Sequence, residues 1–371
     1  FIPPFFSSSS VQPSNFSIIA GNDTSLTVDA ENATGYRWQV NSGDGWTFIE
    51  DTVPFLGSGL SEMQIFDVGM QYHNAQIRCE VYNATSSVYS GAITMNISLY
   101  GSDTIFVTEN GSGNHAGTSW ANALPGTKLQ SAIWMTGHRG AGEIWVAKGT
   151  YHPTATYFEY TLSNPRNKMF ELGNNVKLYG GFSGVETSFN QRNIKSNETT
   201  LSGDIGVAND FFDNCYSILM AAGSSGRECI LDGFTVSGAN FDDDNHGQGG
   251  AISIMSYMGE NKMTISNNTI KNNIINGEAA APIAILGYYY ECSPLIDANI
   301  ITNNSGQFAG ILSYAYGGAT NAVISNNLIS NNAGYGIVYY SAYQSCGGKV
   351  INNTVVNNDS VGVVCIQNTQ P

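Results

Sequence analysis

The sequence predicts an all-β protein in which a β-sandwich is followed by a parallel β-helix. A nine-residue pattern, apolar at its first and sixth positions and asparagine at its fourth, eighth and ninth, begins at residues 265, 296, 324 and 350. A second apolar run follows each copy after a small residue. Repeats of 26 to 31 residues built from short β-branched runs indicate one supersecondary unit stacked on itself. Residues 15–100 instead carry short alternating runs between Gly, Asn and Ser turns, which is typical of a sandwich.

The repeated asparagines predict the corners of the coils. Asparagine tolerates the left-handed backbone angles that tight corners need. Coils stacked about 4.8 Å apart would also let each amide pair with the next one in its column. We interpret the columns as structural ladders rather than as ligand-binding groups. One column contains Asn268, Asn299, Asn327 and Asn353, and the other contains Asn273, Asn304, Asn332 and Asn358.

Six stretches resemble the right-handed parallel β-helix superfamily, the pectate-lyase-like proteins, and in particular secreted proteins of Bacteroidota-type bacteria. They are residues 105–113, 117–122, 143–151, 176–182, 200–205 and 231–236. The resemblance implies a right-handed β-helix over residues 101–371, with an N-terminal cap around 103–135. In that cap, residues 129–135 would form an amphipathic helix that packs Leu129, Ile133 and Trp134 against the first coil.

The sandwich of residues 15–100 resembles bacterial immunoglobulin-like domains. Trp38 matches the core tryptophan of that family, and Cys79 lies in the matching later strand. Here Leu26 or Val28 holds the position that faces Cys79, so no disulfide between the sheets is expected. Trp38 and Cys79 are then core residues. Residues 1–14 precede the sandwich as an extended apolar and serine-rich tail.

Composition restricts the classes of function. The chain has 371 residues and a formal net charge of −15, and no arginine follows Arg227. Nucleic acid is therefore not an expected partner, because a phosphate backbone demands clustered Lys and Arg. No apolar run reaches the roughly 18 residues of a membrane span. The low charge and abundant Gly, Asn, Ser, Thr and Tyr predict an extracellular or cell-surface protein, and the resemblance implies a bacterial one. The start at Phe1 suggests a processed N-terminus.

The six cysteines contain no C-x-x-C pair, so a zinc site is not expected. Cys292 and Cys346 would lie on one face two coils apart, roughly 10 Å, which is too far for a bond. Cys215 and Cys229 are the one pair whose separation suits a local disulfide. The alternative is that both are small buried hydrophobic residues.

The N-terminal tail is unusually apolar. Phe1, Ile2, Phe5 and Phe6 are poor candidates for free solvation, so the tail could add to a neighbouring molecule as a strand or wedge. The alternative is a residual linker between domains of a longer precursor.

The C-terminal coil carries no predicted cap. Val361, Val363 and Ile366 belong to its last strand, and an unpaired strand edge is normally protected in solenoids. Either the natural chain continues beyond Pro371 or another subunit covers this edge. Self-association of the tail with this coil, or binding of other surface proteins, is the resulting hypothesis.

Polysaccharide lyases and hydrolases also use the parallel β-helix, so the resemblance implies a test for catalysis. The lyases need Asp-held calcium and a basic residue, commonly Arg, which the repeats lack. The hydrolases need carboxylates about 5 to 9.5 Å apart in one groove. We assign Asp232, Asp297 and Asp359 to separate coils and separate columns. The sequence therefore argues against an enzyme, and against a calcium-dependent lyase first.

One acidic cluster could bind a metal. Asp242, Asp243 and Asp244, with His246 nearby, could ligate calcium or transfer protons, because hard cations need several oxygens from a flexible loop. The alternative is a solvated turn, since the alternating spacing of an EF-hand is missing. No other cofactor is expected.

The candidate binding site is aromatic. Aligning the second apolar runs places Tyr288, Tyr314 and Tyr340 in one column that Ile366 continues, and one of two alignments adds Tyr257. An outward column would be a flat strip for glycans or a partner protein, whereas an inward column would be an ordinary stacking ladder. The parity of the strands favours the outward direction.

Three tripeptides resemble the Asp-(Ser/Thr)-aliphatic sequon that Bacteroidota use for O-glycosylation outside the cytoplasm. Their acceptors would be Thr52, Thr104 and Ser360, with Thr104 at the domain junction favoured.

Two functions follow from these observations. The first is a non-catalytic extracellular structural protein, acting as a surface stalk, adhesin or self-assembling fibre subunit with the β-helix as a rigid scaffold. The alternative is a polysaccharide-binding or polysaccharide-degrading β-helix protein.

Overall fold

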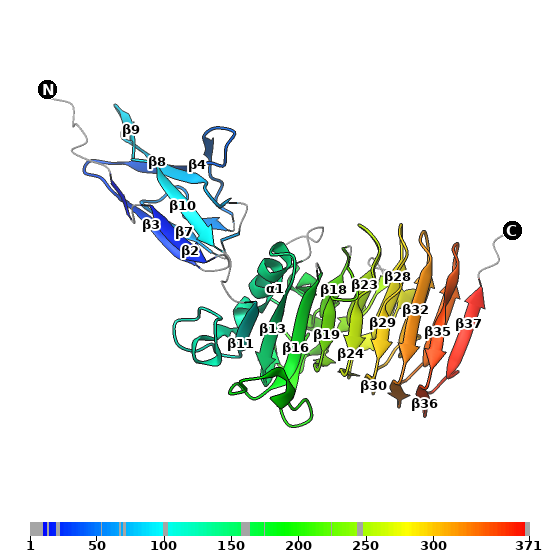
Figure 1. Ribbon diagram of the computed structural model, residues 1–371. Helices are drawn as coiled ribbons and strands as arrows, with labels where there is room; N and C mark the ends of the chain where they lie inside the picture. The colour runs from blue at the N-terminus through cyan, green and yellow to red at the C-terminus, as the bar shows by residue number, and fades with distance from the viewer. Residues whose placement is uncertain are drawn as a thin grey trace. The chain divides into compact units, whose positions relative to one another are not determined.

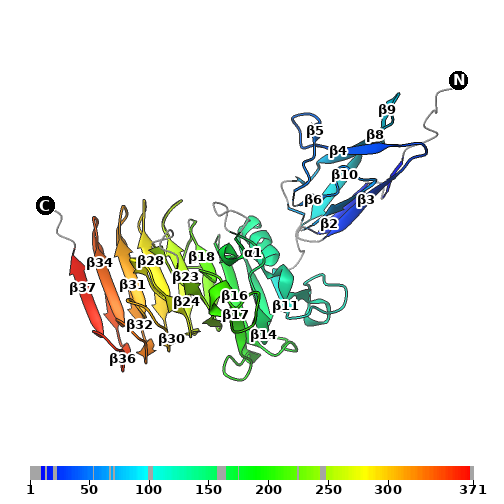
Figure 2. The ribbon, with the colours of Figure 1, turned by 180° about the vertical axis from the view of Figure 1, so that it is seen from behind.

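The computed structural model describes residues 10–12, 15–19, 23–52, 54–66, 68–69, 72–98, 103–156, 164–173, 175–223, 225–242 and 248–367. The chain divides into two compact units, Phe1–Gly101 and Ser102–Pro371. Strands dominate both units, and α1 (Leu129–His138) is the one α-helix of the described residues (Figures 1 and 2). The predicted fold class, a β-sandwich followed by a parallel β-helix, is confirmed.

The first unit contains two sheets of mostly antiparallel strands. In order, the first sheet is β1 (Ser10–Gln12), β3 (Thr24–Asp29), β7 (Glu62–Ile65) and β6 (Phe55–Leu56). The second is β2 (Phe16–Ile19), β10 (Ile93–Ser98), β8 (Gln76–Tyr82), β4 (Gly35–Asn41) and β5 (Thr47–Phe48), with β9 (Ser87–Tyr89) on β8. Trp38 on β4 lies opposite Cys79 on β8, and both side chains are fully buried. The Cys79 thiol is free, as predicted.

The second unit winds three parallel sheets into a β-helix. The first sheet, in order, is β12 (Leu124–Pro125), β11 (Thr104–Thr108), β13 (Gly142–Ala147), β16 (Val176–Phe182), β19 (Ile230–Asp232), β24 (Thr264–Ser266), β29 (Leu295–Asp297), β32 (Thr320–Ser325) and β35 (Cys346–Ile351). The second is β14 (Gly149–Tyr151), β17 (Thr199–Ser202), β20 (Thr235–Ser237), β25 (Thr269–Lys271), β30 (Ile300–Thr302), β33 (Leu328–Ser330) and β36 (Thr354–Val356). The third is β15 (Phe170–Glu171), β18 (Leu219–Ala221), β23 (Ile252–Met255), β28 (Ile283–Gly287), β31 (Ile311–Ala315), β34 (Ile337–Ser341) and β37 (Val363–Gln367). Two short parallel pairs complete the corners: β21 (Asn240–Phe241) with β26 (Ile274–Ile275), and β22 (Gln248–Gly249) with β27 (Ala279–Ala280).

Apolar columns fill the interior of the β-helix. In the first sheet Leu231, Ile265, Ile296 and Ile324 stack in register, and all four side chains are fully buried. Because the side-chain period of a strand is two, their neighbours point outward. In the first two sheets, each complete coil therefore buries the first and sixth residues of the repeated pattern and points the flanking residues outward, whereas strands of the third sheet such as β28 and β31 are buried along their whole length.

The two predicted asparagine ladders are present. In the first, Nδ2 of Asn268 donates to Oδ1 of Asn299 at 3.1 Å, and Nδ2 of Asn299 donates to Oδ1 of Asn327 at 3.0 Å. In the second, Asn273 bonds Asn304 in the same way at 2.9 Å. Each amide also caps a backbone carbonyl of the preceding coil, such as that of Ile265 for Asn299. The first three amides of each ladder are 1% exposed and shielded from water, whereas Asn353 and Asn358 of the last coil are half-buried.

The residue before each ladder asparagine takes the left-handed backbone conformation. Asn267, Asn326 and Asn352 have φ between 53° and 57°, and Ala298 has φ 55° at the equivalent corner. The Cβ of any L-residue crowds the following carbonyl oxygen in this region, but asparagine tolerates it far better than alanine because its short polar side chain can hydrogen-bond locally. Ala298 is therefore the strained member of this column.

We expect Ala298→Asn to raise the free energy of unfolding by about 1 kcal/mol, because asparagine relieves this strain. Urea unfolding followed by tryptophan fluorescence measures the change. Ala333→Asn is the matched control, since Ala333 is also exposed but does not have a positive φ. An equal gain in both variants would show that the benefit does not come from the backbone conformation.

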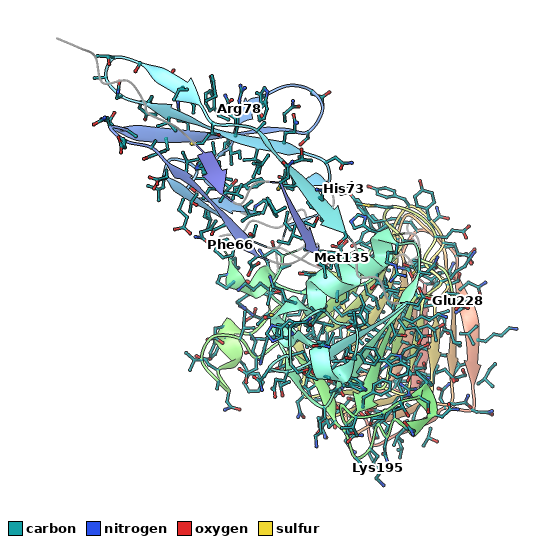
Figure 3. The ribbon with its side chains drawn as sticks, turned by 60° about the vertical axis from the view of Figure 1, so that its left-hand side comes forward. Phe66, His73, Arg78, Met135, Lys195 and Glu228 are labelled. Carbon is teal, nitrogen blue, oxygen red and sulfur yellow. The ribbon has the colours of Figure 1, made fainter. Side chains whose placement is uncertain are left out.

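Helix α1 packs against the start of the β-helix, as predicted, and buries Leu129, Ile133 and Met135 (Figure 3). The expected role of Trp134 was wrong. Its side chain is 36% exposed, and its Nε1 donates to Oε2 of Glu171 at 3.2 Å. A residue that follows Ile133 directly is rotated by about 100° on a helix of 3.6 residues per turn, so it sits at the edge of the buried face.

The positions of the cysteines confirm the predicted separation of Cys292 and Cys346 and exclude the disulfide suggested for Cys215 and Cys229. Cys292, Thr320 and Cys346 follow one another across adjacent coils of the first sheet, which separates the two cysteines by two coils, as expected. Cys215 and Cys229 are both free and fully buried, so the suggested disulfide is absent. Burial raises the pKa of both thiols to about 12, which makes them inert hydrophobic residues rather than nucleophiles.

Candidate functional site: a tyrosine strip along the third sheet

The third sheet and the corners that follow its strands carry the predicted tyrosines. Oγ of Ser313 donates to Oγ1 of Thr320 at 2.9 Å across the interior, so Ser313 points inward and the next residue, Tyr314, points outward. Tyr340 pairs in register with Tyr314 and shares its direction.

The predicted column needs one correction. Tyr314 and Tyr340 are in register with Leu286 and Met255 on one side and with Ile366 on the other. Tyr288 is therefore two residues beyond the column, in the corner after β28, and Tyr257 lies in the corresponding corner after β23. The sequence alignment misplaced Tyr288 because the apolar run before it is longer than the runs in the other coils.

Ring contacts nevertheless join these tyrosines into one strip. Contacts with ring centroids 5.1 to 6.2 Å apart join seven side chains in a series that branches at Tyr316 toward Tyr314 and Tyr343. This tyrosine strip comprises Tyr289, Tyr257, Tyr288, Tyr316, Tyr314, Tyr340 and Tyr343. Edge-to-face and offset pairs at such separations are favourable, so the rings support one another's orientation.

The strip has a buried base and an exposed edge. Tyr314 is 9% exposed and packs with Leu286, Leu312 and Val338 of the same outward face. Tyr289 and Tyr343 are 67% and 56% exposed. Burial, followed by the neighbouring phenols, raises the pKa of Tyr314 to about 12, so its hydroxyl stays neutral at physiological pH. The strip thus offers apolar ring surface together with phenol hydroxyls.

A buried serine fixes the corner that carries the most exposed rings. Oγ of Ser256 donates to the carbonyl of Tyr290 at 2.6 Å and accepts from the backbone N–H of Tyr288 at 3.1 Å. The backbone N–H of Tyr289 donates to the carbonyl of the same serine at 3.2 Å. Ser256 itself is fully buried. Sequence reasoning missed this residue, since a single serine after an apolar run carries no distinctive signal.

The comparison with known families agrees with this architecture. Residues 183–370 match the family model described as right handed beta helix region. The chain belongs to the right-handed β-helix family. A search of curated proteins finds no match.

Because other proteins with this fold are enzymes, the carboxylates of the β-helix are of interest. The assignment of Asp232 and Asp297 to separate columns was wrong. Asp232, Ser266 and Asp297 lie in register on the outward face of the first sheet, so the two carboxylates share a column two strand spacings apart, roughly 10 Å. Both belong to the second position of the repeated pattern, but residues 231–236 are an incomplete earlier copy that lacks the asparagine of the fourth position, which hid the correspondence.

Both carboxylates are engaged in local bonds. Asp232 forms an ion pair with Arg192 and accepts from Oγ of Ser266 and Nδ2 of Asn267, each at 2.6 Å. Oδ1 of Asp297 accepts from Oγ of Ser325 at 2.6 Å and from Nδ2 of Asn326 at 2.8 Å. Both carboxylates therefore tie adjacent coils together. This bonding favours a structural role over that of a proton donor poised for catalysis.

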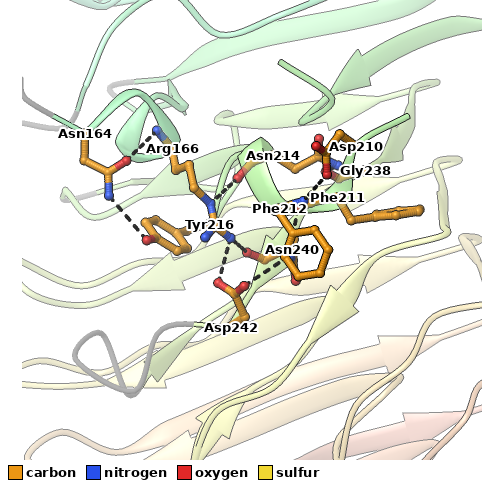
Figure 4. A network of polar contacts seen from close by, with 10 residues as sticks. All are labelled: Asn164, Arg166, Asp210, Phe211, Phe212, Asn214, Tyr216, Gly238, Asn240 and Asp242. Carbon is orange, nitrogen blue, oxygen red and sulfur yellow. Dashed lines mark hydrogen bonds and ion pairs between the residues drawn. The ribbon is translucent and has the colours of Figure 1, made fainter. Parts of the chain in front are cut away.

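The acidic cluster is described only at its first residue. Asp242 forms an ion pair with Arg166 at 2.6 Å, as Figure 4 shows, while Asp243 and Asp244 lie outside the described residues. Among the residues that are described, no group of three His, Cys, Asp or Glu side chains could hold a metal ion. Calcium at this loop stays a prediction.

The remaining candidate residues are placed as follows. Val361 and Val363 of the last coil are 52% and 47% exposed, whereas Ile366 is half-buried against the outward face of the third sheet. Phe1, Ile2, Phe5 and Phe6 lie outside the described residues, so self-association stays a prediction.

The three glycosylation candidates differ in accessibility. Thr52 and Ser360 are exposed, and Thr104 is half-buried at the start of β11. Among the described residues, no helix is both long enough and apolar enough to cross a membrane.

Proposed function

We propose that this β-helix protein is a non-catalytic extracellular scaffold of the adhesin or stalk type that binds glycans through the tyrosine strip. The observation that carries the proposal is the unbroken series of ring contacts from Tyr289 to Tyr343, in the corners that follow β23, β28, β31 and β34. Tyrosine supplies large contact area at low conformational-entropy cost, and its hydroxyl can bond to sugar hydroxyls.

The arrangement of the strip suits a sugar chain. Successive coils are about 4.8 Å apart, so rings from adjacent coils form a row that extends along the helix axis. Neutral phenols suit an uncharged polysaccharide, because no fixed charge has to be desolvated on binding. The side chains of Asp232 and Asp297 are hydrogen-bonded to serines of the neighbouring coil. The rings of the tyrosine strip are therefore the more accessible groups for binding.

The proposal is tested by affinity electrophoresis in gels that contain neutral polysaccharides, namely xyloglucan, mixed-linkage β-glucan or galactomannan. We expect at least one of these polysaccharides to retard the wild-type chain. The double variant Tyr289→Ala, Tyr343→Ala should lower the affinity derived from this retardation about tenfold or more. Each exposed ring that stacks on a sugar face should contribute about 1 kcal/mol, by analogy with aromatic pairs.

Phe212→Ala is the matched control. Phe212 is 81% exposed on the β-helix but lies outside the strip, so its loss should leave the retardation unchanged. Equal mobility of the wild type in every gel, or equal retardation of wild type and double variant, would contradict glycan binding by the strip.

A further inference from the structure

The second sheet of the sandwich presents a face on which arginines and aromatic rings alternate. Arg37 and Arg78 are the only Lys or Arg residues among the first 100, which contain nine Asp and Glu. Both arginines stand on the same outward face, because β4 and β8 pair Arg37 with Glu80 and Gln39 with Arg78 while Trp38 points into the core. Both arginines of this acidic unit thus lie on one surface.

Arg78 stacks on two aromatic rings. Its guanidinium carbon lies 4.0 Å from the ring centroid of Trp46 and 4.0 Å from that of Tyr89 (Figure 3 labels Arg78). Its Nε donates to Oε1 of Gln39 at 2.8 Å. Two rings and one hydrogen bond therefore contact the guanidinium group and restrict its position.

The two arginines differ in how their charge is balanced. Arg37 stacks against Phe48 and Tyr82, with its guanidinium carbon 4.8 and 5.3 Å from their centroids, and forms an ion pair with Glu80 at 2.8 Å. No Asp or Glu of the described part of the chain forms an ion pair with Arg78. Arg78 thus keeps an uncompensated positive charge, whereas the neighbouring charge of Arg37 is paired with Glu80.

A guanidinium in this setting is prepared for a carboxylate. Its Nη groups form a planar fork that matches the two oxygens of a carboxylate, and such charge-assisted pairs are the stronger hydrogen bonds. Stacking has already restricted the side chain, so little conformational entropy remains to be lost on binding. Tyr89 and Phe48, 44% and 51% exposed, flank the site with flat apolar area.

We propose that this face of the sandwich binds a glycan that carries a carboxylate, with Arg78 holding the carboxylate and the neighbouring rings contacting the sugar. Rings that stand side by side on a sheet face offer flat surfaces for sugar rings, whereas an extended peptide would gain its main-chain bonds at a sheet edge. The proposal concerns the sandwich alone and does not depend on the tyrosine strip of the β-helix.

Isothermal titration calorimetry on the full chain in 50 mM NaCl, an ionic strength of about 0.05 M that limits screening, tests the proposal. The probes are a tetrasaccharide that carries glucuronic acid, the same tetrasaccharide with its carboxyl group reduced, and a glutamate tetrapeptide. We expect measurable binding of the acidic sugar, with affinity at least tenfold lower for the reduced sugar and for the peptide. Arg78→Lys keeps the charge but loses the fork, and should also weaken the acidic sugar about tenfold.

Lys195→Gln is the control for charge, since Lys195 is exposed on the β-helix and its substitution removes the same positive charge as Arg78→Gln. Only Arg78→Gln should abolish binding. Thermal unfolding of each variant separates a loss of fold from a loss of binding. Three results would overturn the proposal: no binding of the acidic sugar by the folded wild type, equal binding by Arg78→Lys, or equal binding of the peptide. Tyr289→Ala should bind the acidic sugar like the wild type, so the two glycan proposals can fail separately.

Discussion

Asn299→Ala is expected to lower the free energy of unfolding of the β-helix by about 3 to 5 kcal/mol. The side chain is 1% exposed and makes four hydrogen bonds. Alanine would leave the carbonyl of Ile265 and the backbone N–H of Asn268 buried without these partners. Each buried group that loses its partner costs about 1 to 3 kcal/mol, and a ladder of amides loses more than the sum of isolated bonds.

Urea unfolding with tryptophan fluorescence measures the loss, and the form of the transition carries further information. A solenoid is stabilised by contacts between neighbouring coils, so a weak coil in the middle can separate the transitions on its two sides. Asn321→Ala is the control, because Asn321 is exposed on β32 and should change stability by less than about 0.5 kcal/mol. If Asn299→Ala were as mild as this control, the ladder would be a by-product of the corners and not a source of stability.

The ladders could be predicted because each nine-residue pattern has a fixed internal length. Counting from Ile265 or Ile296 reaches the same corner in every coil, so the amide columns follow directly from the alignment of the sequence. The corners with a left-handed backbone conformation could be predicted in the same way. The exception is Ala298, where alanine replaces asparagine although the backbone keeps the left-handed conformation. At these corners the residue types that the pattern repeats are the ones that the backbone conformation favours, so one register fits the sequence better than any other.

The tyrosine column was harder to predict because nothing fixes the length of the segment before it. The run before Tyr288 is apolar from Ala279 to Leu286 and therefore fits the third sheet in two registers two residues apart. A shift of two keeps every side chain on its face, so the outward direction remained correct although Tyr288 was misplaced. Side-chain contacts such as the bond from Ser256 to Tyr290 depend on how corners fold back and have no signature in the sequence.

Arg166 is a second case that sequence reasoning could not reach, since its partners lie 48 to 76 residues further along the chain. Its Nε donates to the carbonyl of Asn214 at 2.8 Å, and one Nη donates to the carbonyl of Asn240 at 2.7 Å (Figure 4). The same guanidinium lies 4.0 Å above the ring of Tyr216. One side chain thus joins the 3₁₀ helix Pro165–Asn167 to two later corners.

We expect Arg166→Met to lower the free energy of unfolding by about 2 to 4 kcal/mol. Methionine fills a similar length but donates no hydrogen bond, so the carbonyls of Asn214 and Asn240, which belong to buried residues, lose their charged donor. The ion pair with Asp242 contributes less, because the aspartate side chain is 34% exposed and water screens it. Urea unfolding of the full chain measures the difference.

Two further variants separate the carbonyl bonds from the ion pair. Asp242→Asn removes the charge and keeps both carbonyl bonds, so it should cost less than about 1 kcal/mol. Arg166→Lys keeps a charge near Asp242 but cannot reach two carbonyls and cover Tyr216 at once, so its loss should fall between the other two. If Asp242→Asn proved as damaging as Arg166→Met, the dominant contact would be the ion pair. Asp242 would then be committed to holding the coil closed, and the hypothesis of a calcium site at Asp242, Asp243 and Asp244 would lose its best-placed ligand.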